Sequence, residues 1–158
     1  MKTTETLDMQ GRLRLHLSDA NGRVVQVISA PNHILLSGRD LVAKMFTVGG
    51  LKPISHLAVG TGTRAVTPDD SQLAEEVIRV AINPIRVDQD LSDIMTEDGK
   101  DKRKRVMIAA QLGFDQANLP LTEAALFNED GIIYNRIVFD PVAKTQDFKL
   151  SLIWEITF

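Results

Sequence analysis

The segment 148–158 alternates between two sets of side chains, one of which is made only of large apolar residues. Strict alternation of this kind is typical of a β-strand that buries one face. The side chains predicted to share the buried face are Phe148, Leu150, Leu152, Trp154, Ile156 and Phe158. Burying side chains of this size stabilises a fold by about 1.5–3 kcal/mol each. We therefore expect a strand packed against a second layer, with the C-terminal residue still part of the structure.

A second alternating segment, 12–17, is followed by Asn21-Gly22 and then by the Val- and Ile-rich segment 23–29. Asn-Gly favours the positive φ angles of a tight hairpin turn. The sequence therefore predicts a hairpin over 12–29. Its register places Leu13, Leu15 and Leu17 inside, and Arg12, Arg14 and His16 outside.

Other parts of the chain also show β-like patterns. The remaining strands are predicted over 54–59, 77–87, 106–114 and 125–139. Pro84 predicts an edge or a bulge in the second of these, because proline has no N–H for a strand ladder. Asp130-Gly131 is a hairpin turn signal, so the last of them is predicted to be a hairpin. Asp140-Pro141 is expected to end it.

Two short helices are predicted. The first runs over 37–48, with Ser37 as its N-cap and Gly49-Gly50 as its stop. Its expected apolar face consists of Leu41, Val42, Met45 and Phe46. The second begins at Thr67-Pro68, a capping residue followed by a proline at the first helical position, and runs to Glu76.

These patterns give a fold class. A chain of 158 residues has the length of one domain, and its 44% hydrophobic and 25% charged residues are ordinary globular values. Strands do not alternate regularly with long helices, which argues against a parallel α/β fold. We predict a mainly β, antiparallel β-sandwich-like single domain over 1–158 with one or two short helices. The segment 1–31 is a candidate assembly arm. The segment 88–105 is predicted to be a long charged loop, either the tip of a long hairpin or a mobile loop.

Composition excludes several functional classes. The chain has no Cys, which excludes disulfides, thiolate catalysis and Cys-ligated metals. A net charge of −3 gives no global attraction to nucleic acid or to an anionic membrane. The polar N-terminal residues 1–8 have no apolar core of a secretory signal, and no apolar run has the length of a membrane span. We expect no direct membrane insertion.

The best motif for chemistry is Gly60-Thr61-Gly62-Thr63-Arg64-Ala65, which resembles a dinucleotide-binding loop. That function requires a helix to begin within the loop. Here the helix signals come only at Thr67, so we interpret the glycines as a strand-to-loop turn. The neighbouring acids Asp69-Asp70 and Glu75-Glu76 are interpreted as solvated carboxylates that complement a helix dipole.

The remaining polar residues do not form a recognisable active site. The three histidines, His16, His33 and His56, have no metal-ligand spacing. No Ser lies in a nucleophile elbow. We therefore expect no catalytic residue, no metal ligand and no cofactor.

One charged segment is a candidate for contact between subunits. Residues 100–105 hold five basic side chains, flanked by acids and without the interleaved aromatics of a single-strand-binding groove. We expect no nucleic-acid partner. The candidate interface residues are Lys100, Lys102, Arg103, Lys104, Arg105, Arg12 and Arg14. Blocks of opposite charge side by side favour head-to-tail contacts between subunits.

Several segments occur in an order that resembles a known group of proteins. They are 32–43, 54–62, 68–76, 121–128, 135–139 and 154–158. Within them lie a glycine-bearing strand end at Gly60-Thr61-Gly62, a P-x-D-x-x-L-x-x-E pattern at 68–76, an E-x-x-L-F pattern at 123–127 and a W-x-x-x-F ending. The chain resembles small structural proteins of phage tails and of phage-tail-like contractile injection particles. The resemblance covers about residues 32–158.

The resemblance implies a non-enzymatic structural adaptor. Its expected partners are other subunits of such a particle, namely sheath, tube, baseplate, cap or fibre proteins, in a symmetric homo-oligomeric assembly. It implies a protein that is cytoplasmic on synthesis and is then incorporated into the particle. The alternative is a carbohydrate- or receptor-binding β-sandwich module of a tail fibre. Such a module normally needs exposed aromatics, and Tyr134 and Trp154 are the only Tyr and Trp in the chain.

Overall fold

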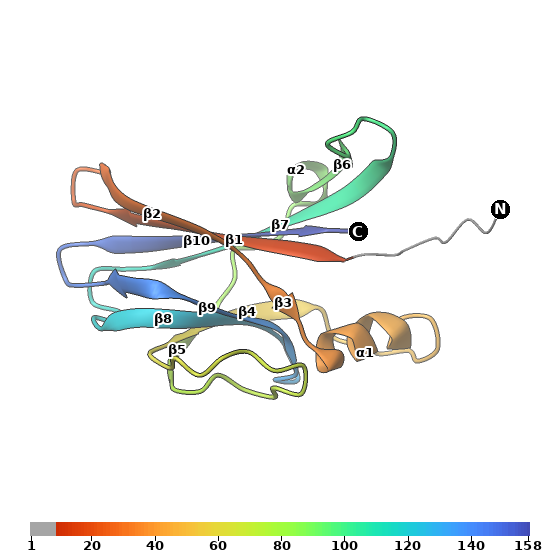
Figure 1. The fold of residues 1–158 in the computed structure, drawn as a ribbon, viewed down its shortest axis with the longest axis horizontal. Coiled ribbons are helices and arrows are strands. Elements are labelled where there is room, and N and C mark those ends of the chain that lie inside the picture. Colours follow the sequence, from red (N-terminus) through yellow and green to blue (C-terminus); the bar gives the residue numbers. More distant parts are fainter. Residues whose placement is uncertain (1–8) are drawn as a thin grey trace.

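The computed structural model describes residues 9–158, which form two antiparallel sheets packed face to face (Figure 1). Sheet A contains β1 (Gln10–Ser18), β2 (Val24–Pro31), β6 (Leu91–Met95), β7 (Lys102–Leu112) and β10 (Lys149–Thr157). Sheet B contains β3 (His33–Ile34), β4 (Ile54–Gly60), β5 (Glu76–Ala81), β8 (Pro120–Asn128) and β9 (Ile133–Ala143). The helices are α1 (Leu36–Lys44) and α2 (Val87–Asp90). The predicted fold class is confirmed. The polar segment 1–8 lies outside the described residues.

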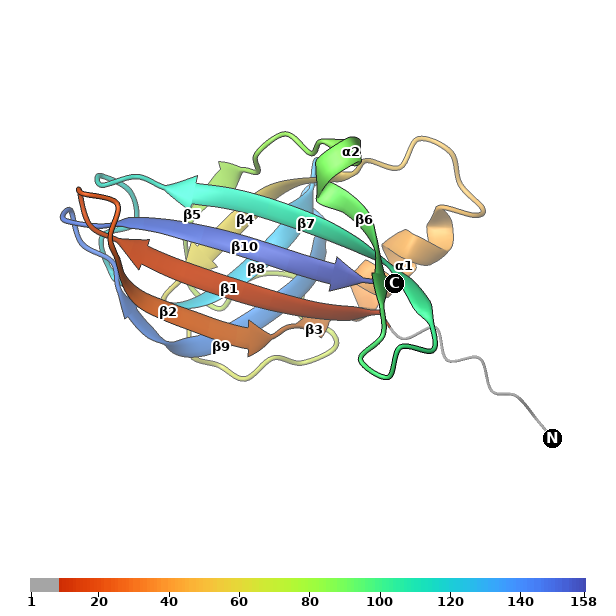
Figure 2. The same cartoon turned by 90° about the horizontal axis from the view of Figure 1, so that it is seen from above.

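Sheet A has the strand order β2-β1-β10-β7-β6. The predicted N-terminal hairpin is confirmed, with Gly22 at φ +79° in its turn. However, β1 pairs with β10 along its whole length, from Gln10 opposite Thr157 to Ser18 opposite Lys149. From residue 10 onward the hairpin is therefore an integral part of the sandwich and not a separate arm (Figure 2).

Sheet B has the order β3-β9-β8-β4-β5. Its central strands β8 and β9 form the predicted hairpin, whose turn places Gly131 at φ +78°. The expected break at Asp140-Pro141 does not occur, because β9 continues to Ala143. Pairing instead shifts between Leu121 and Glu123 of the facing strand, an irregularity that accommodates the proline within the strand.

The core lies between the two sheets and is built as the alternation predicted. In β10, Leu150, Leu152 and Trp154 are fully buried. The prediction is wrong at the end of the segment, where Phe158 is 37% exposed. The three leucines of β1 are buried as expected: Leu13, Leu15 and Leu17.

The first predicted helix is shorter than expected. It begins at Leu36, and its cap residue is Leu35. Ser37 is not the cap, because its hydroxyl donates a hydrogen bond to the Ile133 carbonyl oxygen at 2.6 Å. The helix approaches sheet B through Gly38, where a Cβ would lie 2.1 Å from the Tyr134 carbonyl oxygen.

The predicted apolar face of that helix packs only in part. Val42 contacts the core, but Met45 and Phe46 lie beyond the last helical residue and are 72% and 88% exposed. Figure 1 shows this end of α1 projecting from one end of the sandwich. Because the helix ends at Lys44, Met45 and Phe46 follow it at the projecting end and do not join the core.

Of the two alternatives for 88–105, the structure shows a hairpin, and the prediction of a long loop is wrong for most of the segment. The segment contains α2, β6 and the first part of β7, and only the tip at 96–101 lies between strands. Asp93 of β6 is paired in register with Lys104 of β7, and their side chains form an ion pair. Cross-strand pairs of opposite charge stabilise a sheet. The mixed charges that suggested a loop are therefore compatible with a hairpin.

The predicted strand over 77–87 is also shorter than expected. It is β5, which ends at Ala81, before Pro84. The chain then crosses from sheet B to sheet A, where the Asn83 N–H donates to the Ala109 carbonyl oxygen at 2.7 Å. Neither helix in residues 9–158 has the length or apolar character needed to cross a membrane.

Candidate functional site

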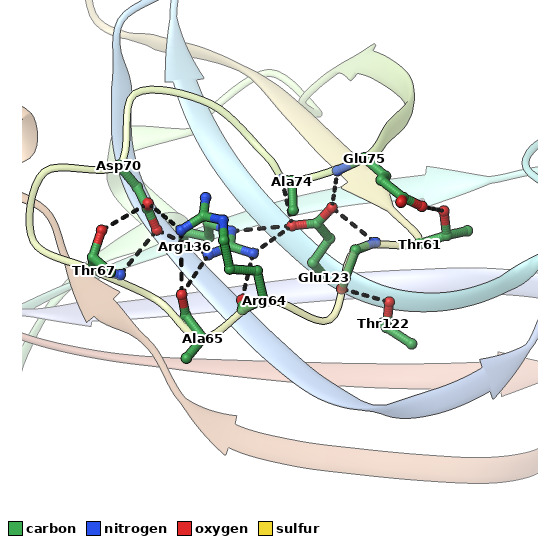
Figure 3. A network of polar contacts seen from close by, with 11 residues as sticks. Thr61, Arg64, Ala65, Thr67, Asp70, Ala74, Glu75, Thr122, Glu123 and Arg136 are labelled. Atoms are coloured by element: carbon green, nitrogen blue, oxygen red, sulfur yellow. Dashed lines mark hydrogen bonds and ion pairs between the residues drawn. The ribbon is translucent and has the colours of Figure 1, made fainter.

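The second predicted helix does not form. The side chains that hold this segment as a loop instead make up the first charged site of the molecule. Residues 61–75 make an irregular loop outside β8 and β9. Four of its backbone N–H groups, those of Gly62, Thr67, Ala74 and Glu75, donate to the buried carboxylates of Asp70 and Glu123. We call Asp70, Glu123 and Arg136 the buried ion cluster (Figure 3).

Arg136 lies at the centre of this cluster, and its side chain is fully buried. Its Nε and Nη2 donate to Glu123 Oε2 at 3.0 and 2.9 Å, and its Nη1 donates to Asp70 Oδ2 at 2.8 Å. The remaining guanidinium protons reach two loop carbonyls, those of Arg64 at 2.8 Å and Ala65 at 3.4 Å. An arginine has five N–H donors. All of them have a partner here.

Glu123 comes from β8 and connects Arg136 to the loop. Its carboxylate accepts the backbone N–H groups of Gly62 and Ala74 at 3.0 Å each and that of Glu75 at 2.7 Å. Both ends of the loop are thus bound to one side chain that has no exposed surface. A buried carboxylate is tolerated because the guanidinium and the three N–H donors replace its hydration.

Asp70 binds the middle of the loop. It accepts the Thr67 N–H at 3.0 Å and the Thr67 hydroxyl at 2.9 Å, and it forms ion pairs with Arg64 and Arg136 at 2.8 Å each. The interpretation of Asp69-Asp70 as two solvated carboxylates is wrong for Asp70, which is only 7% exposed. Thr67 was expected to cap a helix, but here it is held by a carboxylate in a turn.

The glycines of the Gly60-Thr61-Gly62 motif give the loop room. A Cβ on Gly60 would lie 2.2 Å from the Glu75 carbonyl oxygen, and one on Gly62 would lie 2.4 Å from Glu123 Oε1. The interpretation of these glycines as part of a strand-to-loop turn is confirmed. Their physical role is to admit a carboxylate and a second stretch of backbone from the same chain.

The pKa values of both carboxylates follow from this geometry. Burial alone would raise the pKa of Asp70, but hydrogen bonds from Thr67, Arg64 and Arg136 outweigh burial and hold that pKa well below its ordinary value. Burial likewise opposes ionisation of Glu123. The N–H groups of Glu75 and Ala74 together with Arg136 lower the pKa of Glu123 all the same.

This arrangement predicts acid sensitivity. A carboxylate with a lowered native pKa stabilises the fold above its unfolded pKa, about 4 for Asp and Glu, and that stability is lost as the pH falls through the native pKa. We expect urea unfolding at pH 3 to give a free energy of unfolding at least about 1 kcal/mol below that at pH 7. Asp70→Asn is expected to reduce this difference. Identical pH dependence in the variant and the wild type would contradict the assignment.

The ion cluster is a structural site. No group in it is open to a substrate, since every charged atom of Arg136, Glu123 and Asp70 already has a partner within the chain. Its chemistry is to fix the loop 61–75 against sheet B. One signal for it was present in the sequence, because all three residues lie in the short patterned segments 68–76, 121–128 and 135–139. Their mutual contact was missed.

A second charged site lies on the outer face of sheet A. Side chains of alternate residues share a strand face, so Arg12 and Arg14 of β1 lie on the same side as Arg103 and Arg105 of β7. We call these four side chains the basic face. β10 runs between the two pairs and contributes Glu155, the one acid that these three strands place on this side.

The basic face borders an open cavity of about 790 Å³. The β6–β7 hairpin rises from sheet A in Figure 1 and passes the end of β10 towards the start of β1 in Figure 2. Ile94 and Glu97 from this hairpin line the cavity together with Arg12, Arg14 and Arg103. Arg14 pairs with Glu155 at 3.1 Å, with 44% and 23% of the two side chains exposed.

The structure therefore divides the seven residues predicted to form an interface. Arg12, Arg14, Arg103 and Arg105 lie on the basic face. Lys102 and Lys104 alternate with the arginines of β7 and belong to the opposite face, and Lys100 lies at the hairpin tip. Because most of the expected basic run lies in a strand, its charges point in two directions, and two of the five join the arginines of the N-terminal hairpin.

Residues 9–158 contain no group of three or more His, Asp or Glu side chains placed to hold a metal ion. The histidines lie apart on β1, β3 and β4. The His56 ring shares a hydrogen bond with the Ser55 hydroxyl, at 2.7 Å between Nδ1 and Oγ. Comparison of the chain with protein-family models, curated proteins and solved structures finds no match.

Proposed function

We propose that this protein is a non-enzymatic structural adaptor subunit of a phage-tail-like contractile particle. It joins sheath or tube, baseplate, cap or fibre components and works by presenting binding surfaces on a rigid sandwich. The observation that carries the proposal is the projecting end of α1, where Met45 and Phe46 are 72% and 88% exposed. Large apolar side chains on a projecting element are typical of a surface that another protein covers.

A second exposed apolar surface supports an assembly role. Strand β2 forms one edge of sheet A, and Val24, Val25 and Val27 on it are 47%, 47% and 57% exposed. An edge strand with exposed valines and a free ladder is a template for pairing with another chain. Such an edge is unfavourable in an isolated protein and useful in a subunit of a larger particle.

The resemblance to tail-particle proteins has a physical counterpart. The segments 54–62, 68–76, 121–128 and 135–139 are distant in sequence, but they meet in sheet B and in the buried ion cluster. These four segments thus share one structural role, which is to hold the loop 61–75 against sheet B. The carbohydrate-binding alternative has less support, because Trp154 and Tyr134 are 0% and 4% exposed and offer no platform for sugar stacking.

Co-sedimentation tests the proposal. A tagged form made in cells that produce a contractile particle is expected to sediment with sheath and tube subunits. Phe46→Ser is expected to abolish this association while changing the free energy of unfolding by no more than about 0.5 kcal/mol, since Phe46 packs little.

Leu119→Ser is the matched control. Leu119 is also an exposed apolar residue, at 45%, but it lies in the loop before β8, away from α1. The control is expected to co-sediment like the wild type. Failure of the wild-type protein to sediment with any particle component would overturn the proposal, as would equal losses for the two variants.

A further inference from the structure

We propose that the basic face of sheet A is a docking site for an extended, carboxylate-rich segment of a partner protein. Four of the seven interface residues predicted from the sequence form this face, and its binding does not depend on α1 or β2, on which the proposed function rests. It begins from a local excess of charge. Four arginines share this face with Glu155, although the protein as a whole carries a net charge of −3.

The arginines are arranged in two rows. Arg12 and Arg14 lie along β1, and Arg103 and Arg105 lie along β7, with β10 between the two strands. Neighbouring strands are about 4.8 Å apart, so the rows are separated by about 10 Å. The outward side chains of β10 form the floor between them. An extended segment lying along β10 would therefore have guanidinium groups on both sides.

The spacing within each row fits an extended ligand. Alternate residues of a strand are about 6.6–6.8 Å apart, which is also the repeat of side chains on one face of an extended peptide. Two arginines in a row can then meet two acidic side chains in successive positions of the same face. Planar guanidinium groups bind carboxylates through paired hydrogen bonds, which makes arginine suited to this recognition.

The floor and walls favour a peptide over a bare anion. Ile153 on β10 and Met107 on β7 lie on the same face of sheet A, where they line a second cavity together with residues of the segment 83–90. The β6–β7 hairpin contributes Ile94 as a wall of the 790 Å³ cavity. A cavity of this size lies within the ordinary range for ligand sites. The ligand should thus carry apolar side chains alternating with its acids.

One buried polar group at this face has no partner among the described residues. Arg105 Nε makes no hydrogen bond. Buried donors and acceptors without partners are uncommon and unfavourable. A bound segment would supply carboxylate and backbone groups within reach of this part of the face.

Nucleic acid is the less suitable polyanion. Glu97 and Glu155 line the same cavity and would repel phosphates along a continuous backbone. Among the described residues that line it, none is aromatic, so the cavity offers no surface for base stacking. Discrete carboxylates on alternate residues can avoid the two glutamates, which a uniformly charged strand cannot do.

Fluorescence anisotropy with a defined probe tests the proposal. The probe is a labelled synthetic peptide that alternates Glu and Val, and the comparison ligands are a Lys-Val peptide and single-stranded DNA. The full-length protein is expected to bind the Glu-Val peptide more tightly than either, with affinity that falls as salt is added. Arg103→Gln and Arg12→Gln are each expected to weaken peptide binding about tenfold, as loss of a charge-assisted hydrogen bond implies.

Lys104→Gln is the matched control, because it removes the same charge from the next residue but on the opposite face of β7. It is expected to weaken binding less than about twofold, in line with a distant screened charge. Thermal unfolding of each variant verifies that it is folded. The proposal is overturned if the wild type does not bind the Glu-Val peptide, if DNA binds more tightly, or if Lys104→Gln and Arg103→Gln weaken binding equally.

Discussion

Replacing Arg136 by Met is expected to lower the free energy of unfolding by about 3–5 kcal/mol. Among residues 9–158, the substitution removes the one cation that forms an ion pair with Glu123 and one of the two that form ion pairs with Asp70. Both carboxylates would then be buried without adequate compensation, although Met fills a similar volume. For a chain of this length the midpoint of thermal unfolding should fall by about 10 °C. Differential scanning calorimetry and urea unfolding measure both quantities.

Arg64→Gln is the matched control for this prediction. Arg64 also forms an ion pair with Asp70, at the same 2.8 Å as Arg136, but its side chain is 50% exposed. Exposed ion pairs contribute little, so we expect a loss below about 1 kcal/mol. A loss for Arg136→Met no greater than that for Arg64→Gln would show that the buried ion cluster does not hold the loop.

Gly60→Ala is expected to destabilise the protein by about 2–4 kcal/mol. The new methyl group would need the space of the Glu75 carbonyl oxygen, 2.2 Å from the Cβ position. That oxygen accepts the Thr61 N–H at 3.0 Å, so moving it also weakens a backbone hydrogen bond. Overpacking costs about 1–3 kcal/mol and a lost hydrogen bond about 1 kcal/mol. Chemical unfolding measures the sum.

The control for this substitution is Gly49→Ala. A Cβ on Gly49 would meet nothing within 4 Å. Replacing a glycine in such a position changes stability by no more than about 1 kcal/mol, and in the stabilising direction when the backbone permits it. If Gly60→Ala proved as mild as Gly49→Ala, the glycines of the Gly60-Thr61-Gly62 motif would have no packing role.

The strands were predictable because their signal is local. Alternation in 12–17 and 148–158 requires only that one face be buried, and the second layer that covers these residues need not be known in advance. The exposed Phe158 marks the limit of this reasoning. The alternation continues to the last residue, but the core does not extend that far.

The helix expected at Thr67 shows where local reasoning fails. A capping threonine followed by proline and two acids is favourable for a helix start, but the same residues also suit a turn. What decides between them is Glu123 and Arg136, which lie some 50 to 70 residues later in the chain. A sequence pattern that is read locally contains no information about such partners. For the same reason the solvated interpretation of Asp70 was wrong.

For the charged segment 88–105 the difference is reversed, because regular structure forms where a loop was predicted. Its composition suggested a loop, because a dense mixture of acids and bases resembles a solvated surface. Pairing of Asp93 with Lys104 across two strands requires the same mixture. The basic face could not be predicted as a unit either, since it combines two arginines of β1 with two of β7, and β10 brings them together from the far end of the sequence.

The long separation between Glu123 and the loop that it binds also affects how the protein folds. The three N–H groups bound by this carboxylate precede it by between 48 and 61 residues. During synthesis the loop 61–75 leaves the ribosome before β8 and β9 exist, and closing contacts over such distances is slow. The loop should therefore become ordered only when the β8–β9 hairpin forms. In this half of the sandwich the loop 61–75 is synthesised before β8 and β9, but it is expected to become ordered no earlier than they do.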